Sequence, residues 1–366
     1  MQIAEKITRL TFGSLLLLFF LASTSTGTEA VRGDPAARLL TSEFASEHWE
    51  FTARFDSGHL LFVEFIITNI GLGDRNAAVI AHLVTPEGKL SRFANGRRES
   101  NWNLSSDRLR IKLGASLLDL HEPTYQLRVD KRKVRVDLHF RPDGPAVWSE
   151  AFSPPGYTLD LLAAAVPVEG TLWVSGMTEP VHVHGTLAAT HSWLNERGSS
   201  LVRQRLEFFS LQENFPLYSI DLITPAGSHV RWMIVKQQGK KVYESRTFEL
   251  SQEGEAKEPH DPGYEAPDTL HFKSTEIEGQ ARLERIVVRD DPLTDLPQPF
   301  RFLVALALDL HPRRVWALSP FEVFFTTNPA PADHMSQRAQ GTGVTAITFL
   351  NPRPVSQPRV TTRWFR

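Results

Sequence analysis

The chain has 366 residues, no cysteine, 40 Lys and Arg against 42 Asp and Glu, and 41% hydrophobic residues. This length suits two domains of ordinary size, and the hydrophobic share is enough to bury a core, which excludes a mostly disordered chain. The lack of cysteine excludes disulfides, thiolate catalysis and cysteine metal sites. The balanced charge gives no basic surface for nucleic acid, so we expect no nucleic-acid partner.

Residues 1–30 have the pattern of a secretory signal peptide. Lys6 and Arg9 precede an apolar run, Phe12–Ala22, and small and polar residues follow it. A basic start, a short apolar run and a small-residue exit are typical of such a segment. The run is shorter than the ~20 residues that span a membrane. We therefore expect export to the periplasm or the extracellular space, with an uncleaved signal anchor as the alternative.

The first half of the body, residues 42–165, is rich in short strand-like runs. Lys133–Phe140 alternates most cleanly, because Val134, Val136 and Leu138 are separated by polar residues, as in a half-buried strand. The other runs expected to form strands here are His59–Asn69, Asn76–Thr85, Arg108–Leu113 and Tyr125–Asp130.

A second strand-rich series follows the proline-containing stretch Trp148–Gly170, which we take as the boundary between two domains. The second domain is expected at 170–350, with an exposed acidic loop at Gln252–Asp268. Its expected strands are Gly170–Ser175, Val181–Leu187, Val202–Glu213, Leu217–Thr224, His229–Gln237, Lys241–Leu250, Leu270–Phe272, Gly279–Val288, Phe300–Leu310 and Pro320–Thr326. No regular helical pattern separates the strands, so the predicted fold class is all-β, with antiparallel barrels or sandwiches.

A short internal repeat supports two related domains. Leu83–Gly88 reads LVTPEG, and Leu222–Gly227 reads LITPAG, 139 residues further on. In both places an apolar run enters a turn of the Pro-x-Gly type. Such turns are common hairpin punctuation, so the repeat is a weak indication by itself.

Two blocks of the sequence resemble a known superfamily. His48–Glu50, Leu61–Gly71 and Ala77–Gly88 resemble the AttH-like, survival-factor-type and carotenoid 1,2-hydratase proteins, and His184–Trp193 with Leu222–Pro225 is compatible with their second domain. The resemblance implies two tandem lipocalin-like antiparallel β-barrels or half-barrels that face each other, with an apolar pocket. Members include lipid-handling proteins, carotenoid hydratases and cyclisation catalysts of the Diels–Alder type, so the fold does not settle the function.

One departure from that superfamily weighs against hydratase chemistry. The stretch Glu47–Phe51 lacks the paired aromatic residues expected at the start of a hydratase.

Two carboxylates lie inside apolar runs and are the candidate catalytic residues. If Glu64 faces a pocket, burial would raise its pKa and make it a general acid; the alternative is an edge position where it meets solvent or an arginine. Asp221 could complete a two-carboxylate site with Glu64, although an outward-facing position is the favoured prediction for it.

The histidines predict hydrogen bonding near a ligand rather than metal binding. His182 and His184 share one face of a strand, and His191 follows. An H-x-H pair can start a metal site, but no carboxylate follows at the spacing of a cupin-like site, so no metal is expected. No phosphate-binding loop and no G-x-S-x-G motif is present, so we also expect no cofactor and no α/β-hydrolase elbow.

The eight tryptophans are spread over both halves, and apolar ligand sites are lined mainly by such side chains. Ordinary core packing is the alternative for each one of them. The predicted ligand-binding residues are Trp49, Glu64, Asn69, His184, His191, Trp193 and Trp232.

The sequence thus predicts an exported binding protein or carrier for an apolar small molecule, a lipid or an isoprenoid. A hydratase or cyclase acting on a polyene in the same pocket is one alternative, with Glu64 or Asp221 protonating the alkene. A non-catalytic interaction protein is the other, and a molecule without a continuous cavity of a few hundred Å³ would favour it. Peripheral contact with a membrane is compatible with an apolar ligand, and the oligomeric state is left open.

Overall fold

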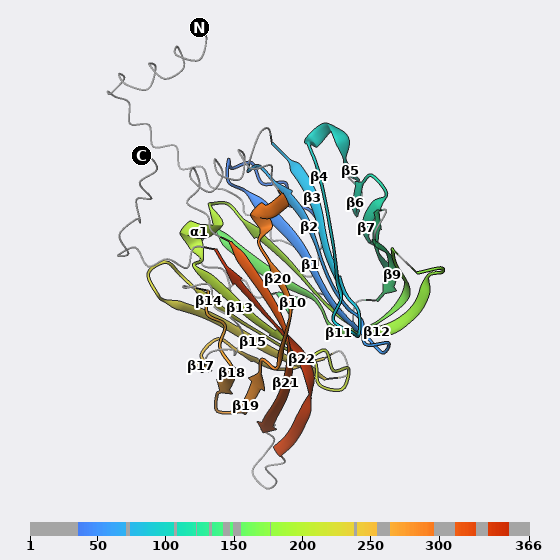
Figure 1. Cartoon of the computed structure of the whole chain (residues 1–366). Coiled ribbons are helices and arrows are strands. Elements are labelled where there is room, and N and C mark those ends of the chain that lie inside the picture. The colour runs from blue at the N-terminus through green and yellow to red at the C-terminus, as the bar shows by residue number, and fades with distance from the viewer. Residues whose placement is uncertain are drawn as a thin grey trace, which may run out of the picture. The chain divides into compact units, whose positions relative to one another are not determined.

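The structure, a computed structural model, describes residues 36–70, 74–105, 108–121, 123–131, 134–141, 147–148, 155–175, 177–237, 240–254, 264–295, 312–326 and 336–350. The predicted signal segment, the predicted strand at Phe300–Leu310 and one of the eight tryptophans, Trp364, lie outside the described residues. Almost all of the described chain is strand, and the strands form two antiparallel sheets within the unit Arg32–Arg366 (Figure 1).

The first sheet, coloured blue to green in Figure 1, has the strand order β4-β3-β2-β1-β12-β11-β9-β8-β7-β6-β5, with β10 beside β11. It curls, because β3 and β4 at one edge contact β6, and β4 also contacts β9. Its strands are β1 (Ser46–Phe55), β2 (Leu60–Thr68), β3 (Asn76–Val84), β4 (Leu90–Arg97), β5 (Asn103–Leu104), β6 (Leu109–Leu113), β7 (Ser116–Leu120), β8 (Tyr125–Lys131), β9 (Val134–Phe140), β10 (Val147–Trp148), β11 (Tyr157–Val174) and β12 (Val181–Leu194).

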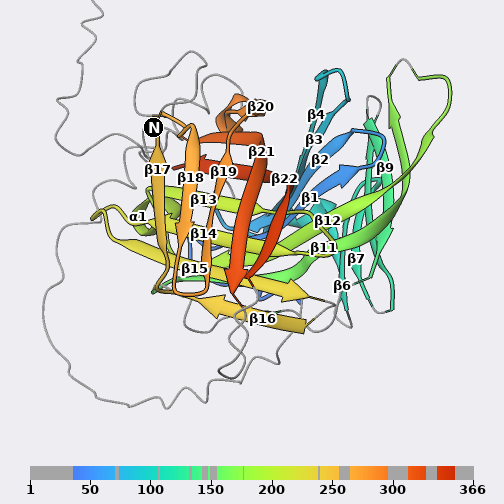
Figure 2. The same cartoon turned by 90° about the horizontal axis from the view of Figure 1, so that it is seen from below.

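The second sheet, coloured yellow-green to red, has the order β16-β15-β14-β13-β22-β21-β19-β18-β17, with β20 beside β21 (Figure 2). Its strands are β13 (Gln204–Phe209), β14 (Leu217–Ile223), β15 (His229–Gln237), β16 (Lys240–Ser245), β17 (Glu249–Glu253), β18 (Thr269–Lys273), β19 (Ile277–Arg282), β20 (Arg285–Asp290), β21 (Arg313–Thr326) and β22 (Ser336–Phe349). The described helices are short: η1 (Glu99–Asn101), α1 (Gly198–Leu201) and η2 (Pro292–Asp295).

The two sheets repeat one topology, which confirms the predicted all-β class with two tandem half-barrels. In each sheet the first strand pairs with the second and with the last, so that β1 lies between β2 and β12 as β13 lies between β14 and β22. The matched sequence turns are not equivalent positions in this repeat. Thr85–Gly88 joins β3 to β4, whereas Thr224–Gly227 joins β14 to β15, one hairpin earlier. Both turns put their glycine at positive φ, so they share a turn geometry but not an equivalent position in the repeat.

The boundary between the sheets differs from the predicted one. β11 runs through residues 165–170 and β12 completes the first sheet, so the change of sheet falls at residues 195–203. Pro167 does not break β11 because it pairs with Thr186 of β12 on one side, while the pairing with β9 on the other side begins only at Val168. The prolines of Trp148–Gly170 suggested a linker, but β11 occupies much of that stretch.

Alternation along the strands divides the buried apolar residues into three layers. One layer fills the inside of the first half-barrel, including Phe51 and Leu127, and a second fills the other, including Phe208 and Phe272. The third layer lies between the sheets and takes residues from both, for example Phe62 and Leu159 from the first and Ile220 and Val344 from the second. A site between the sheets must therefore be formed by side chains that point outward from the two half-barrels.

Candidate functional site

A cluster of buried charged side chains interrupts the apolar layer between the sheets. Glu50 on β1 and Glu64 on β2 come from the first sheet, and Arg205 and Glu207 on β13 and Arg314 on β21 come from the second. Their neighbours along each strand point into the half-barrels, so alternation places all five side chains in the same layer.

Glu64 is held from three directions. Arg314 donates from both terminal nitrogens, with Nη2 3.1 Å from Oε1, and His48 Nδ1 lies 2.7 Å from the same oxygen. Burial pushes the pKa of Glu64 upward, but Arg314 and His48 outweigh burial and hold it below its usual range. Glu64 is therefore buried but meets an arginine, as the alternative prediction had it. Its pKa is lowered, so burial does not make it the general acid considered in the sequence analysis.

Glu207 is in the opposite electrostatic situation. It accepts hydrogen bonds from Arg205 Nε and from the Tyr218 hydroxyl, each at 2.7 Å, and Arg205 also pairs with Glu50. Burial raises the pKa of Glu207; the charge of Arg205 opposes this shift, and the like charge of Glu50 reinforces it. Two carboxylates on facing sheets thus have pKa values that are pushed apart.

The space that these groups surround is small. Phe62, Phe209 and Trp316 form its apolar wall, and the Trp316 ring lies 5.2 Å from that of Phe62. The cavity has a volume of about 30 Å³, room for about two water molecules. Ligand pockets for small molecules usually have roughly 300–1,000 Å³. The side chains of the two sheets therefore fill most of the layer between them.

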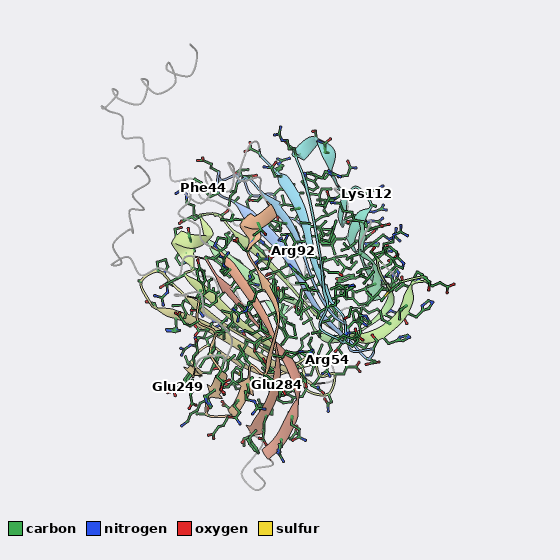
Figure 3. All side chains as sticks on the ribbon, in the orientation of Figure 1. Phe44, Arg54, Arg92, Lys112, Glu249 and Glu284 are labelled. Atoms are coloured by element: carbon green, nitrogen blue, oxygen red, sulfur yellow. The ribbon has the colours of Figure 1, made fainter. Side chains whose placement is uncertain are left out.

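Further contacts link the sheets around the cluster. Arg92 of β4 and Arg54 of β1 are labelled in Figure 3. Arg92 Nε lies 2.8 Å from Asp290 Oδ1 of β20, and His82 of β3 lies 3.4 Å from the same oxygen. Arg54 donates to the carbonyl of Thr342 at 3.3 Å. Burial raises the pKa of Asp290, but His82 and Arg92 outweigh it and lower that pKa.

Three predicted ligand-binding residues come together elsewhere, inside the first half-barrel. The ring of His191 stacks on Trp49 at 4.6 Å and lies 4.9 Å from Trp193. Its Nε2 lies 2.8 Å from Glu47 Oε1. These residues occupy the face of β1 and β12 opposite to that of Glu64, so they do not share a site with it.

Two other predicted residues have contacts of a different kind. Asn69 holds the segment before β1, since its amide donates to the carbonyls of Leu40 and Ser42 at 3.0 and 2.8 Å. The His184 side chain is 71% exposed, and among the described residues its ion-pair contact is with Glu169, 3.9 Å away. Among the contacts described, neither residue touches the inter-sheet cluster.

Asp221 and Trp232 lie on opposite faces of the second sheet. Asp221 is fully buried inside the half-barrel, where His229 Nδ1 lies 2.8 Å and Arg231 Nε 3.2 Å from its Oδ2. The prediction that Asp221 faces outward is wrong, and it does not pair with Glu64. Trp232 lies in the layer between the sheets, with its ring 5.7 Å from that of Tyr218, whose hydroxyl donates to Glu207.

Sequence reasoning missed four of the five charged residues of the cluster, Glu50, Arg205, Glu207 and Arg314. It also missed Tyr218, which donates to Glu207. In the sequence, Arg205 and Glu207 alternate with apolar residues, which is the pattern of a solvent-facing strand surface. What distinguishes the cluster is pairing across the sheets, because Glu50 and Glu64 of the first sheet each meet an arginine of the second. That signal needs the packing of the two sheets.

Two further properties concern the described part of the chain. No group of three or more His, Asp or Glu side chains in it is placed to hold a metal ion. None of its helices has the length and apolar character needed to cross a membrane.

The fold is similar to that of several solved structures. A protein assigned as AttH from Nitrosomonas europaea aligns with a TM-score of 0.61 at 14% identity, over 84% of this chain and 94% of its own. CghA with Sch210972 aligns with a TM-score of 0.60 at 13% identity, over 88% and 96%. Kievitone hydratase from Nectria haematococca aligns with a TM-score of 0.56 at 10% identity, over 87% and 98%. No family model matches the sequence, and no curated protein matches it.

These similarities concern the fold. The chain has the two-domain lipocalin-like fold of these structures, which confirms the resemblance seen in the sequence at the level of the fold.

Proposed function

We propose that the protein binds an apolar small molecule with one polar group, of the lipid or isoprenoid class, between its two sheets. The observation that carries this proposal is the convergence of Glu50, Glu64, Arg205, Glu207 and Arg314 in an otherwise apolar layer. A layer that served packing alone would be about as stable with apolar residues at these positions, because desolvating ions is costly. The charges are better explained as groups that orient a ligand.

The apolar part of the ligand would lie against Phe62, Phe209 and Trp316. Burial of apolar surface contributes roughly 25 cal/mol per Å², and the Tyr218–Glu207 pair would hydrogen-bond the polar group. Because the cavity holds about 30 Å³, binding requires these side chains to move apart. Both arginines of the cluster are already paired with carboxylates, so a neutral polar group suits the site better than an anionic one.

The test uses a variant in which the site is larger. Trp316→Ala removes the largest apolar side chain of the wall, and we expect it to tighten the binding of a fluorescent polyene, methyl parinarate, by about tenfold, because the ligand then fills the vacated space. Trp173→Ala is the matched control, since Trp173 packs under Arg135 on the first sheet, away from this wall. Equal affinities for both variants and the unaltered chain would contradict the proposal and favour an interaction protein with filled barrels.

A second candidate, a hydratase or cyclase acting on a polyene, is favoured by the opposed pKa shifts of Glu64 and Glu207. Pairs of titratable groups whose surroundings push their pKa values apart serve as acid and base in many enzymes. Here Glu207, with its raised pKa, would protonate the alkene, and Glu64 with His48 would accept a proton from the attacking water. Kievitone hydratase is one of the structural neighbours named above.

The catalytic candidate is tested with Glu207→Gln. If the protein adds water to a polyene, we expect this change to abolish the mass gain of one water while polyene binding remains. Unchanged turnover in the variant would rule out Glu207 as the acid.

We also propose, from the basic and apolar segment at residues 1–30, that the protein acts after export. Immunodetection of the protein in fractionated cells tests this proposal.

A further inference from the structure

The contacts of Glu64 extend to a serine through a single histidine. Ser46 Oγ lies 2.5 Å from His48 Nε2, and His48 Nδ1 lies 2.7 Å from Glu64 Oε1. We propose that Ser46 is an activated serine nucleophile that takes an acyl group from a small ester, with His48 as its general base and Glu64 as the residue that orients His48. This proposal is independent of what binds between the sheets.

The hydrogen bonds assign the tautomer of His48. Arg314 keeps Glu64 ionised, so Glu64 can only accept, and His48 Nδ1 must carry the proton. In the neutral imidazole this leaves Nε2 as the acceptor, facing the Ser46 hydroxyl. Serine nucleophiles on unrelated folds are activated in this way: the hydroxyl is hydrogen-bonded to a base, and a third group holds the base in place.

The backbone holds the three side chains in this order. Ser46 and His48 lie two residues apart on β1, so they share the face that points toward the second sheet. Glu64 lies on the neighbouring strand β2, where it pairs in register with Glu50, the next residue of β1 on that face. Ser46 does not lie in a G-x-S-x-G motif, so a search for that motif does not find it.

The reaction follows from these atoms. Ser46 Oγ attacks the ester carbonyl carbon, and its proton passes to His48 Nε2. The bond from that carbon to the alkoxy oxygen then breaks, and the leaving alkoxide takes the proton from Nε2 as an alcohol. Water, deprotonated by the same nitrogen, later attacks the acyl carbon. The bond from that carbon to Ser46 Oγ then breaks, Oγ takes the proton back from Nε2, and a carboxylic acid leaves.

Access favours small acyl donors. Ser46 is 5% exposed, while the side chain of His48 is 19% exposed, so solvent reaches the imidazole. A short acyl group such as acetyl fits this restricted approach better than a long chain.

The chain contains a matched control. Ser57 Oγ lies 2.9 Å from His59 Nδ1 with the same two-residue spacing, in the turn between β1 and β2. Among the contacts of the described residues, no carboxylate hydrogen-bonds the ring of His59. Ser57 is exposed, so it should outcompete Ser46 if accessibility alone decided reactivity.

The experiment treats the full chain with an ethyl fluorophosphonate and maps the modified serine by tandem mass spectrometry. We expect label on Ser46 and not on Ser57, and a labelling rate about 100-fold lower in His48→Gln, the usual scale of a lost general base. Glu64→Gln should slow labelling as well, with circular dichroism confirming that each variant is folded. p-Nitrophenyl acetate should leave an acetyl group on Ser46.

Three results would overturn the proposal: an unlabelled Ser46 when trypsin in the same tube is labelled, equal labelling of Ser57, or an unchanged rate in folded His48→Gln. None of them bears on polyene binding, which the Trp316 variant tests separately.

Discussion

At the scale of the residue, Glu64 shows how one neighbour reverses the effect of burial. A carboxylate in an apolar strand is expected to have a raised pKa, yet the two-pronged contact with Arg314 lowers it. Arg314 lies 250 positions away along the chain, so no local pattern around Glu64 reveals it. Glu207, which looked like a surface residue, has the raised pKa instead.

The first prediction concerns this pair. Arg314→Leu leaves Glu64 buried with only His48 beside it, and we expect a loss of about 3–5 kcal/mol in the free energy of unfolding, because a buried charge without its partner is costly. Urea unfolding measures it. Arg338→Leu, which breaks an exposed pair with Glu322, should change stability by less than ~1 kcal/mol. Equal losses in both variants would show that the buried pair has no special role.

At the scale of the element, strand pairing decides which segments form strands where the composition of a segment is ambiguous. The predicted strands His59–Asn69, Asn76–Thr85 and Lys133–Phe140 match β2, β3 and β9 closely, because each has strong alternation or a dense β-branched run between turn residues. β1 was missed, although it carries Glu50, His48 and Ser46. Its sequence, SEHWEFTARF, mixes charges with aromatics, and only pairing with β2 and β12 on both sides makes it a central strand.

A second prediction tests how closely the central strands approach. A Cβ on Gly185 of β12 would lie 2.1 Å from the carbonyl oxygen of Arg54 on β1, whereas a Cβ on Gly96 of the edge strand β4 would meet nothing within 4 Å. We expect Gly185→Ala to cost about 1–3 kcal/mol through backbone displacement. Gly96→Ala should be neutral within ~0.5 kcal/mol. Thermal unfolding of both variants checks this, and similar midpoints would contradict the register of β1 and β12.

At the scale of the whole described unit, ion pairs join two half-barrels that each have a filled core. Glu64–Arg314 and Asp290–Arg92 link the sheets on two sides of the small cavity, and Glu50–Arg205 forms a third link. The sheets are thus joined by charge as well as by apolar contact, so their association should depend on pH.

The third prediction follows from that dependence. Glu64 and Asp290 have folded-state pKa values below their unfolded values, so the stability they contribute is present above about pH 4 and is lost as the pH falls through the folded values. We expect the urea midpoint to fall as the pH is lowered from about 5 toward 2. The double variant Glu64→Leu with Arg314→Leu should show a shallower fall. An identical slope would mean that this pair does not couple stability to pH.

The sequence by itself determined the all-β class, the tandem arrangement and the superfamily resemblance, because alternation and turn residues are local properties that survive without knowledge of the partner strand. It also marked Glu64 as unusual. Only the tertiary structure decided that the first sheet ends near residue 194, that Asp221 is buried away from Glu64, and that Glu50, Glu207 and both arginines meet across the sheets. The physical reason is that charge pairing between sheets depends on which faces pack together, and a strand with polar residues on one face looks the same whether that face meets water or an opposite charge.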